Sequence, residues 1–250
     1  MSTWIFLRGL TRESRHWGDF PAAFRGEIPA ADIVALDLPG NGRLHRMRSP
    51  TSVAAMAEYC RAELLAQGIR PPYRLLAMSL GAMVAVAWAT KHPEEIAGCV
   101  LINTSLRPFS PFYSRLRPGN YAALLGLALP GGNADATERT ILRLTSKLAG
   151  QRTQIVAAWS AWRREHPVSH ANALRQLLAA SRYRAPARKP AVPMLILAGA
   201  ADTLVDPRCS QQLARLWQTD FAEHPGAGHD IPLDDGAWVV RQVRDWLLRA

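Results

Sequence analysis

The chain has 250 residues, of which 48% are hydrophobic and 20% charged, and its formal net charge is +10. This length suits one domain, or one core with a sizeable insertion. No uncharged apolar run of about 18 residues occurs and the amino terminus has no basic segment before an apolar one, so we expect no membrane span, no secretory signal and a cytoplasmic location.

The positive charge lies in one block. Residues 107–190 carry fourteen Lys or Arg against three acids, whereas the remaining chain carries sixteen bases and seventeen acids. No helix-turn-helix, zinc-finger spacing or aromatic RNA-binding strand accompanies the block, so we expect no nucleic-acid partner. The three widely spaced cysteines, Cys60, Cys99 and Cys209, predict reduced thiols rather than a disulfide or metal framework.

Continuous apolar runs separated by helical patterns predict an α/β fold with a mostly parallel sheet of about six strands, flanked by helices on both faces. The expected strands are residues 4–7, 33–36, 73–77, 99–102, 194–198 and, more weakly, 219–222. The expected helices of this core are a short one opened by Trp17, one capped by Thr51 or Ser52 that ends near Gly68, and residues 80–91 and 237–249.

Residues 107–187 interrupt this alternation with a purely helical pattern. We expect four helices there, over residues 120–129, 135–148, 151–165 and 169–182, with Asn120 and Ser169 as N-caps and Asp135 with Glu138 as a capping box. Because they follow a strand's carboxyl end, they should form a cap over that end of the sheet, where the functional groups of such folds gather. The sequence thus divides into a core, residues 1–106 and 188–250, and a cap, residues 107–187.

A strand passes directly into a helix at Ala77-Met78-Ser79-Leu80-Gly81. Such a sharp turn places Ser79 at the tip, in a strained conformation, and the small residues Ala77 and Gly81 permit the bend. This is the logic of the G-x-S-x-G nucleophile elbow, with Ala in the first position. The alternative interpretation is an ordinary serine N-cap.

A serine nucleophile needs a base and an anion that orients the base. Asp202 follows the fifth strand, and His229 follows the sixth in the run Gly228-His229. Asp206 and His224 compete for these roles, but their spacing from the glycines is worse and we assign them structural roles.

Over essentially its whole length the chain resembles the α/β-hydrolase superfamily, in its serine-esterase branch with a helical cap. The elbow, the order Ser79, Asp202, His229, the loop Asp37-Leu38-Pro39-Gly40-Asn41-Gly42 and Arg8-Gly9-Leu10 carry the resemblance. It implies a triad of Ser79, Asp202 and His229, an oxyanion hole formed by the backbone N–H groups of Leu10 and Leu80, and no cofactor or metal. Arg8 departs from the family's usual histidine and is a candidate either to support the active-site residues from behind or to contact an anionic substrate.

Such a triad predicts hydrolysis of a carboxylic ester or thioester through an acyl-enzyme on Ser79. The cap offers Tyr121, Trp159 and Trp162 as candidate acyl-pocket residues, although packing alone would explain them. Arg139, Arg143 and Lys147 repeat every four residues and form a basic face, which is either simply solvated or steers an acidic partner.

The chain is similar in size and cap type to the pimeloyl-carrier methyl ester esterases. This likeness makes acyl groups carried on acyl carrier protein or coenzyme A candidate substrates, besides small-molecule esters. Two other functions stay open: a non-hydrolytic enzyme that reuses the triad, such as a lyase, acyltransferase or cofactor-free oxygenase, and a ligand-binding protein with a silent triad.

Overall fold

The computed structural model describes residues 2–128, 132–150 and 152–249. Its centre is a six-stranded sheet in the order β2-β1-β3-β4-β5-β6, in which every neighbouring pair is parallel. This confirms the predicted sheet. The strands are β1 (Ser2–Leu7), β2 (Ala31–Leu36), β3 (Tyr73–Met78), β4 (Ile96–Ile102), β5 (Met194–Gly199) and β6 (Asp220–His224).

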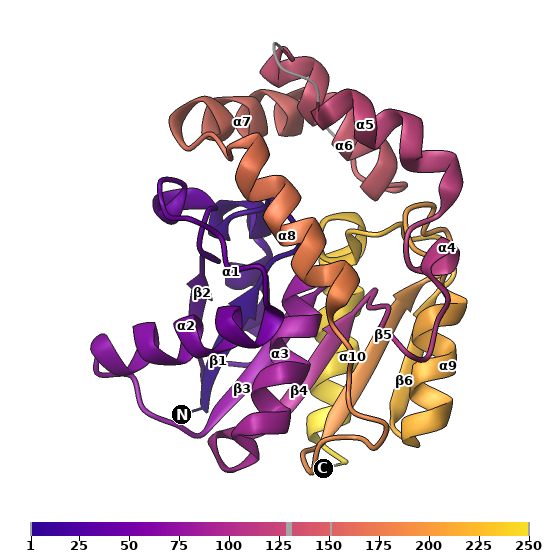
Figure 1. Ribbon diagram of the computed structural model, residues 1–250. Helices are drawn as coiled ribbons and strands as arrows, with labels where there is room; N and C mark the ends of the chain where they lie inside the picture. Colours follow the sequence, from indigo (N-terminus) through magenta and orange to yellow (C-terminus); the bar gives the residue numbers. More distant parts are fainter. Residues whose placement is uncertain (1, 129–131, 151, 250) are drawn as a thin grey trace.

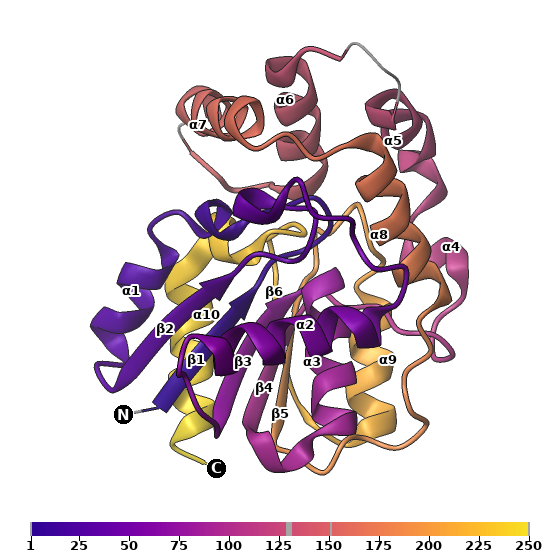
Figure 2. The ribbon, with the colours of Figure 1, turned by 60° about the vertical axis from the view of Figure 1, so that its left-hand side comes forward.

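Successive side chains of each strand enter different hydrophobic layers. Leu75 belongs to the layer beneath α2, α3 and α9, whereas its neighbour Leu76 belongs to the layer beneath α1 and α10 (Figure 2). Both faces are therefore buried, which is why the strands read as continuous apolar runs. The helices are α1 (Phe20–Glu27), α2 (Val53–Ala66), α3 (Leu80–Lys91), α9 (Arg208–Trp217) and α10 (Ile231–Leu247).

The helix α3 has the predicted bounds 80–91, whereas the first and last core helices begin at other positions than predicted. Ser52 caps α2 by accepting a hydrogen bond from the N–H of Ala55, as expected. Trp17 ends a 3-10 turn instead of opening a helix, and α1 begins at Phe20. The final helix starts at Ile231, before the predicted position 237, but it kinks at Asp235, whose carboxylate accepts a hydrogen bond from the N–H of Trp238 and so caps the second part.

Between β4 and β5 the described residues form five helices instead of the expected four. In Figure 1, α5, α6 and α7 lie beyond the carboxyl ends of the strands, and α8 descends from them across the sheet's edge. The ends expected at Leu129 and Gln151 lie outside the described residues. These helices are α4 (Phe112–Arg115), α5 (Tyr121–Ala128), α6 (Ala134–Thr145), α7 (Arg152–Glu165) and α8 (His170–Arg182).

Of the three predicted caps in this segment, one is confirmed and one is wrong. Ser169 caps α8 as expected, through the N–H of Asn172. The N-cap of α6 is Asn133, since Glu138 is buried and ion-paired rather than turned back toward the helix start. Asn120 directly precedes α5, and its side-chain amide donates to the carbonyl oxygen of Thr203 at 2.7 Å, which ties this segment to the loop after β5.

One carboxylate fastens the end of α6 to the core. Asp234, in the first turn of α10, accepts hydrogen bonds from the backbone N–H groups of residues 147–149 at 2.9–3.0 Å, from Ser146 Oγ at 2.5 Å and from the N–H of Gly228 at 2.7 Å. The loop that carries His229 is therefore joined directly to the turn after α6. Among the helices that the structure describes, none is both long and apolar enough to cross a membrane.

Candidate active site

Ser79 stands at the junction of β3 and α3 with φ 54° and ψ −117°, a region that non-glycine residues avoid. Its N–H donates to the carbonyl oxygen of Ile102 at 3.0 Å, and its own carbonyl accepts from Ala82. Its side chain makes no N-cap hydrogen bond. The strained turn predicted for the elbow is present, and it frees the hydroxyl from the capping role of the alternative interpretation.

The loop after β1 lies directly against this turn. A Cβ built on Gly81 would be 2.4 Å from the carbonyl oxygen of Leu7 and 2.7 Å from that of Arg8, so position 81 has no room for a side chain. A Cβ built on Gly9 would be 3.2 Å from Ser79 Cβ, a tight contact. Leu80 is the first residue of α3, and its N–H has no acceptor within the helix. The N–H of Thr11, next to Leu10, donates at 2.9 Å to Gln176 of α8, which fixes the loop from above.

Asp202 and His229 meet at the carboxyl ends of β5 and β6. His229 Nδ1 lies 2.7 Å from Asp202 Oδ2, and both side chains are almost completely buried. The second carboxylate oxygen of Asp202 accepts from the N–H groups of Leu204 and Val205 at 2.8 and 3.0 Å. An ionised carboxylate only accepts, so Nδ1 carries the proton and the lone pair of Nε2 is left for another partner.

The environment of His229 acts on its pKa in two directions. Burial lowers the pKa, but the charge and the hydrogen bond of Asp202, together with the charge of Asp230, outweigh burial and raise the pKa above its ordinary value. Arg8 partly opposes this rise. The imidazole is thus set to accept a proton and to be stabilised once it is charged.

Asn103, which the sequence analysis did not single out, joins the two halves of this site. It follows β4 with φ 45°; its Nδ2 donates to the carbonyl oxygens of Gly228 and His229 at 3.0 and 2.7 Å, and its Oδ1 accepts from the N–H of Gly199 at 2.9 Å. One buried side chain therefore holds the acid loop and the base loop together. Its position after a strand's carboxyl end was the only signal available in the sequence.

Arg8 is buried and ion-paired with Asp230, the residue after His229. The two nitrogens Nη1 and Nη2 donate to the two carboxylate oxygens at 3.2 and 2.5 Å, and the guanidinium lies 4.8 Å from the ring centroid of Trp17. The side chain is 3% exposed. These contacts are those of a residue that supports its neighbours, which is the first of the two roles considered for Arg8.

Trp159 and Trp162 lie against a polar cluster where α6 and α7 meet the loop after β1. Both rings pack around His16 at centroid distances of 5.3 Å, and the Arg12 guanidinium lies 4.5 Å from the Trp159 centroid. Glu138 accepts from Arg12 at 2.7 Å and from Arg163 at 2.5 Å. These contacts give the two tryptophans a packing role in the described structure.

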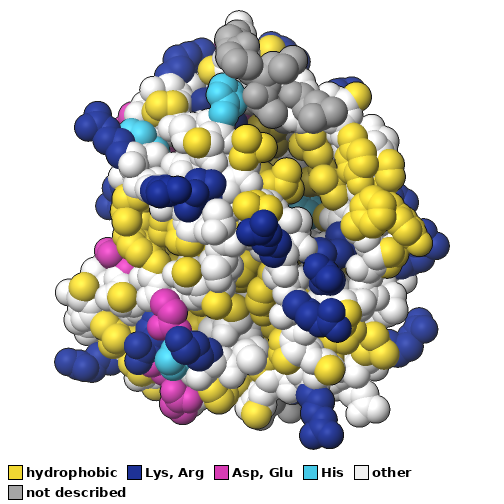
Figure 3. All heavy atoms as spheres, in the orientation of Figure 1, with side chains coloured by type: hydrophobic (Ala, Val, Ile, Leu, Met, Phe, Trp, Pro, Cys, Tyr) yellow, Lys and Arg dark blue, Asp and Glu magenta, His cyan; other side chains and the backbone are white. Residues whose placement is uncertain are grey.

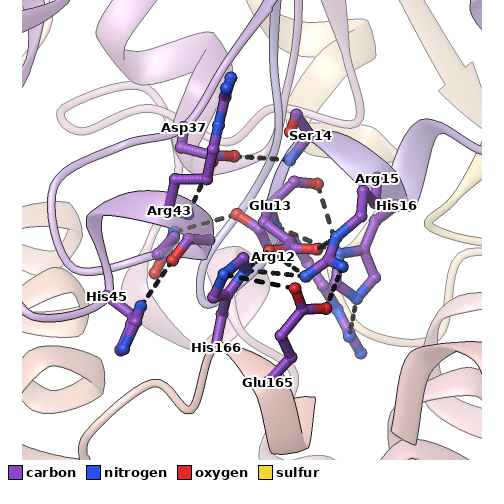
Figure 4. A network of polar contacts seen from close by, with 12 residues as sticks. Arg12, Glu13, Ser14, Arg15, His16, Asp37, Arg43, His45, Glu165 and His166 are labelled. Atoms are coloured by element: carbon purple, nitrogen blue, oxygen red, sulfur yellow. Dashed lines mark hydrogen bonds and ion pairs between the residues drawn. The ribbon is translucent and has the colours of Figure 1, made fainter. Parts of the chain in front are cut away.

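Figure 4 shows the continuation of this cluster along the same loop. Arg15 contacts Glu13, Glu165 and His166, and the ring of His166 stacks on His45 at 5.1 Å. Asp37 accepts from the N–H groups of Ser14 and Arg43 at 2.7 and 3.0 Å, which gives the D-x-P-G-x-G loop its shape. The loops after β1 and β2 and the end of α7 are thus bound together by polar side chains.

The remaining candidate residues take different positions. Arg139 and Arg143 are exposed on α6, and Tyr121 is half-buried at the start of α5. Lys147 is exposed just beyond the end of α6, where its side chain lies against Gly228, the residue before His229. Asp206 pairs with Arg208. His224 accepts from the N–H groups of residues 226 and 227 through Nδ1, which is the structural role expected for it.

Within the described residues, one group has the spacing of metal ligands: His92, Glu94 and Glu95. It lies at the amino end of β4, whereas Ser79 follows the carboxyl end of β3, so the two are at opposite ends of the parallel strands. Glu95 is already hydrogen-bonded to Arg61 and Trp88 at 2.7 and 3.0 Å. This group does not contribute to the candidate active site.

The chain can be compared with known proteins. It is 29% identical over 217 residues, 82% of its length, to polyketide synthase ThaQ from Burkholderia thailandensis, of which it spans only 10%. Its fold is similar to an enol-lactonase from Burkholderia xenovorans (TM-score 0.79, 17% identity, 99% of this chain and 91% of that one) and to an esterase from Thermogutta terrifontis (TM-score 0.74, 21% identity, 100% and 90%). Residues 4–242 match the alpha/beta hydrolase family, and the chain belongs to that family.

Proposed function

We propose that the protein is a serine hydrolase that cleaves a carboxylic ester or thioester through an acyl-enzyme on Ser79. The observation that supports this most is the buried His229–Asp202 pair, with Nδ1 and Oδ2 2.7 Å apart, in the same parallel sheet whose strand β3 ends at a serine with φ 54°. Two hydrogen bonds connect the serine turn with the loop of His229. The N–H of Ser79 donates to the carbonyl oxygen of Ile102, and the side-chain amide of the next residue, Asn103, donates to the carbonyl oxygen of His229.

In this proposal His229 Nε2 takes the proton of Ser79 as its Oγ attacks the carbonyl carbon. The backbone N–H groups of Leu10 and Leu80 stabilise the resulting oxyanion, with help from the amino terminus of α3. The imidazolium then protonates the departing alcohol or thiol. Water, deprotonated by His229, attacks the acyl-enzyme and releases the acid and free Ser79.

Fluorophosphonate labelling tests the nucleophile without knowledge of the substrate. Wild-type protein should be labelled on Ser79, and Ser79→Ala should not be. The exposed Ser181 provides a matched control, since Ser181→Ala should leave labelling unchanged. An unlabelled, folded wild-type protein would refute the proposal and favour a silent triad.

Labelling would not separate hydrolysis from lyase or acyltransferase chemistry by the same triad. Hydrolysis in H₂¹⁸O should place one ¹⁸O atom in the acid product. A product without the label, formed from the same substrate, would contradict the hydrolase and favour a non-hydrolytic reaction.

The charge distribution favours an acidic carrier or an anionic leaving group. No Asp or Glu occurs between residues 96 and 134 or between 166 and 201, whereas these two segments hold eight Arg or Lys. They meet in space, because Arg115 donates to the carbonyl oxygen of Ala180 at 2.7 Å and Ala185 to that of Arg107. Figure 3 shows basic and apolar side chains together on one face of the molecule. Large apolar side chains of the same two segments are exposed, with Phe112 at 73% and Leu174 at 59%.

We therefore propose acyl groups carried on acyl carrier protein or coenzyme A as substrates, with simple esters as surrogates. Purified protein should be screened against p-nitrophenyl esters of graded chain length and against carrier and coenzyme A thioesters. Charge reversal at Arg182 and Arg184, both exposed, should lower kcat/KM at low salt for a carrier-linked acyl group and not for a neutral ester. Reversal of Arg139 and Arg143 tests the basic face of α6 in the same way. Equal effects on both substrates would contradict steering.

A further inference from the structure

The residue beside the proposed base carries a charge that the catalytic steps do not use. Asp230 follows His229, is 2% exposed, and its N–H donates at 2.7 Å to the carbonyl oxygen of Thr145, the last residue of α6. Its carboxylate faces Arg8, whose backbone precedes the Gly9-Leu10 loop. The bidentate pair therefore connects the base loop with the proposed oxyanion loop.

Three charged groups act on the His229 imidazole from the elements packed around it. Asp202 reaches it from the loop after β5, Asp230 is its chain neighbour, and Arg8 approaches from the end of β1. Asp202 and Asp230 favour the imidazolium, while Arg8 opposes it. Without Arg8, two buried carboxylates would act on one histidine; without Asp230, a buried guanidinium would face it.

We propose that Arg8 and Asp230 form a charge-balancing and positioning pair for the base. The pair holds the loop of His229 in position relative to the Leu10 amide, and each of the two charges offsets the effect that the other alone would have on the imidazole. Arg8 and Asp230 are positioning residues, because they act through His229 and not on the reacting atoms. This inference rests on the proposed function of His229 as the general base for Ser79.

The balance between the charges of Arg8 and Asp230 matters for the proposed mechanism. His229 must be neutral to accept the serine proton and then stable as imidazolium, so its affinity for protons has to lie near the working pH. With the charge of Asp230 offset by Arg8, most of the stabilisation of the imidazolium comes from Asp202. An unpaired Asp230 would raise the pKa of His229 further, and an unpaired Arg8 would lower it and weaken His229 as a base.

The test measures the second-order rate of fluorophosphonate labelling at Ser79 between pH 5 and 9, which needs no substrate. Arg8→Met should move the acidic limb of this profile to higher pH, and Asp230→Asn should move it to lower pH, each by about one pH unit. The neutral double variant should return the limb to its wild-type position. Arg8→Lys, which keeps the charge but not the bidentate geometry, should keep the limb and lower the plateau rate.

A matched control comes from the Arg61–Glu95 pair, whose nitrogen and oxygen are 2.7 Å apart, at the amino end of β4. Arg61→Met should lower thermal stability without moving the limb. If Arg8→Met does not fold, Asp230→Asn and the double variant still test the sign and the cancellation. Limbs that move in the same direction, or a double variant that stays shifted, would overturn the inference, whereas absence of wild-type labelling would refute the proposed function itself.

Discussion

The buried cluster around Glu138 gives a sharp prediction about stability. Glu138 is 1% exposed and neutralises two guanidinium groups, Arg12 from the core loop and Arg163 from α7, whose side chains are 8% and 23% exposed. Burial already lowers the pKa of Arg12, which shows the cost of taking this cation out of water. Glu138→Gln keeps the side-chain size but removes the only carboxylate that contacts Arg12 among the described residues.

Breaking a buried pair from one side costs about 3–5 kcal/mol, and we take the lower end because Arg163 retains some solvent contact. A loss of about 3 kcal/mol should lower the Tm of a chain of this length by about 6–12 °C. Thermal unfolding followed by circular dichroism measures the change. Glu165→Gln provides the control, since Glu165 is 59% exposed where it contacts Arg15, and should leave the Tm essentially unchanged.

Adding Arg12→Met to Glu138→Gln removes the more buried of the two cations that have lost their carboxylate, so the double variant should recover part of the lost Tm. A Tm of Glu138→Gln within about 1 °C of wild type would show that the cluster does not stabilise the fold, and the reasoning from burial would be wrong.

Four further outcomes are expected. Asp202→Asn should lower kcat by about 10⁴-fold on any ester that the wild type cleaves, because the amide no longer fixes the tautomer of His229; a loss below tenfold would exclude Asp202 as the orienting acid. Asn103→Ala should lower kcat by about 10–100-fold with little change in KM, since it loosens the acid and base loops without touching substrate; a change in KM alone would contradict this role. In wild type, kcat/KM should fall with decreasing pH through a midpoint above about 6.5, because the raised pKa keeps His229 protonated to higher pH. The same shift adds stability that is complete below about pH 6.5 and is lost as pH rises through the folded-state pKa, so the unfolding midpoint in urea, measured against pH in Ser79→Ala, should decrease across that range.

Much of the scaffold could be predicted because its signals are local. Strands buried on both faces give continuous apolar runs, and the strand-to-helix passage at Ser79 leaves little choice of geometry. The carboxyl ends of parallel strands then share one edge, so Asp202 and His229 could be expected near Ser79 without any knowledge of distances.

The remaining features depend on partners far apart in the chain. Glu138 resembled a helix-capping residue because the sequence does not show that Arg12, 126 positions earlier, will lie 2.7 Å away. The sequence shows Arg8 only as a departure from the family pattern, because it does not reveal that Asp230 will be its ion-pair partner. The helix start at Asn133 rather than Asp135 is a choice between two good capping residues, which intrinsic preference alone does not decide.

The attachment of the turn after α6 to Asp234 is made mostly by peptide N–H groups rather than by side chains. Every residue except proline carries such a group, so positions 147 and 148, whose side chains are exposed, can change their identity while the attachment persists. Substitutions could thus remodel the charge and shape of this surface during evolution while the loop carrying His229 keeps its place. Selection for a new partner and retention of the chemistry need not conflict at this turn.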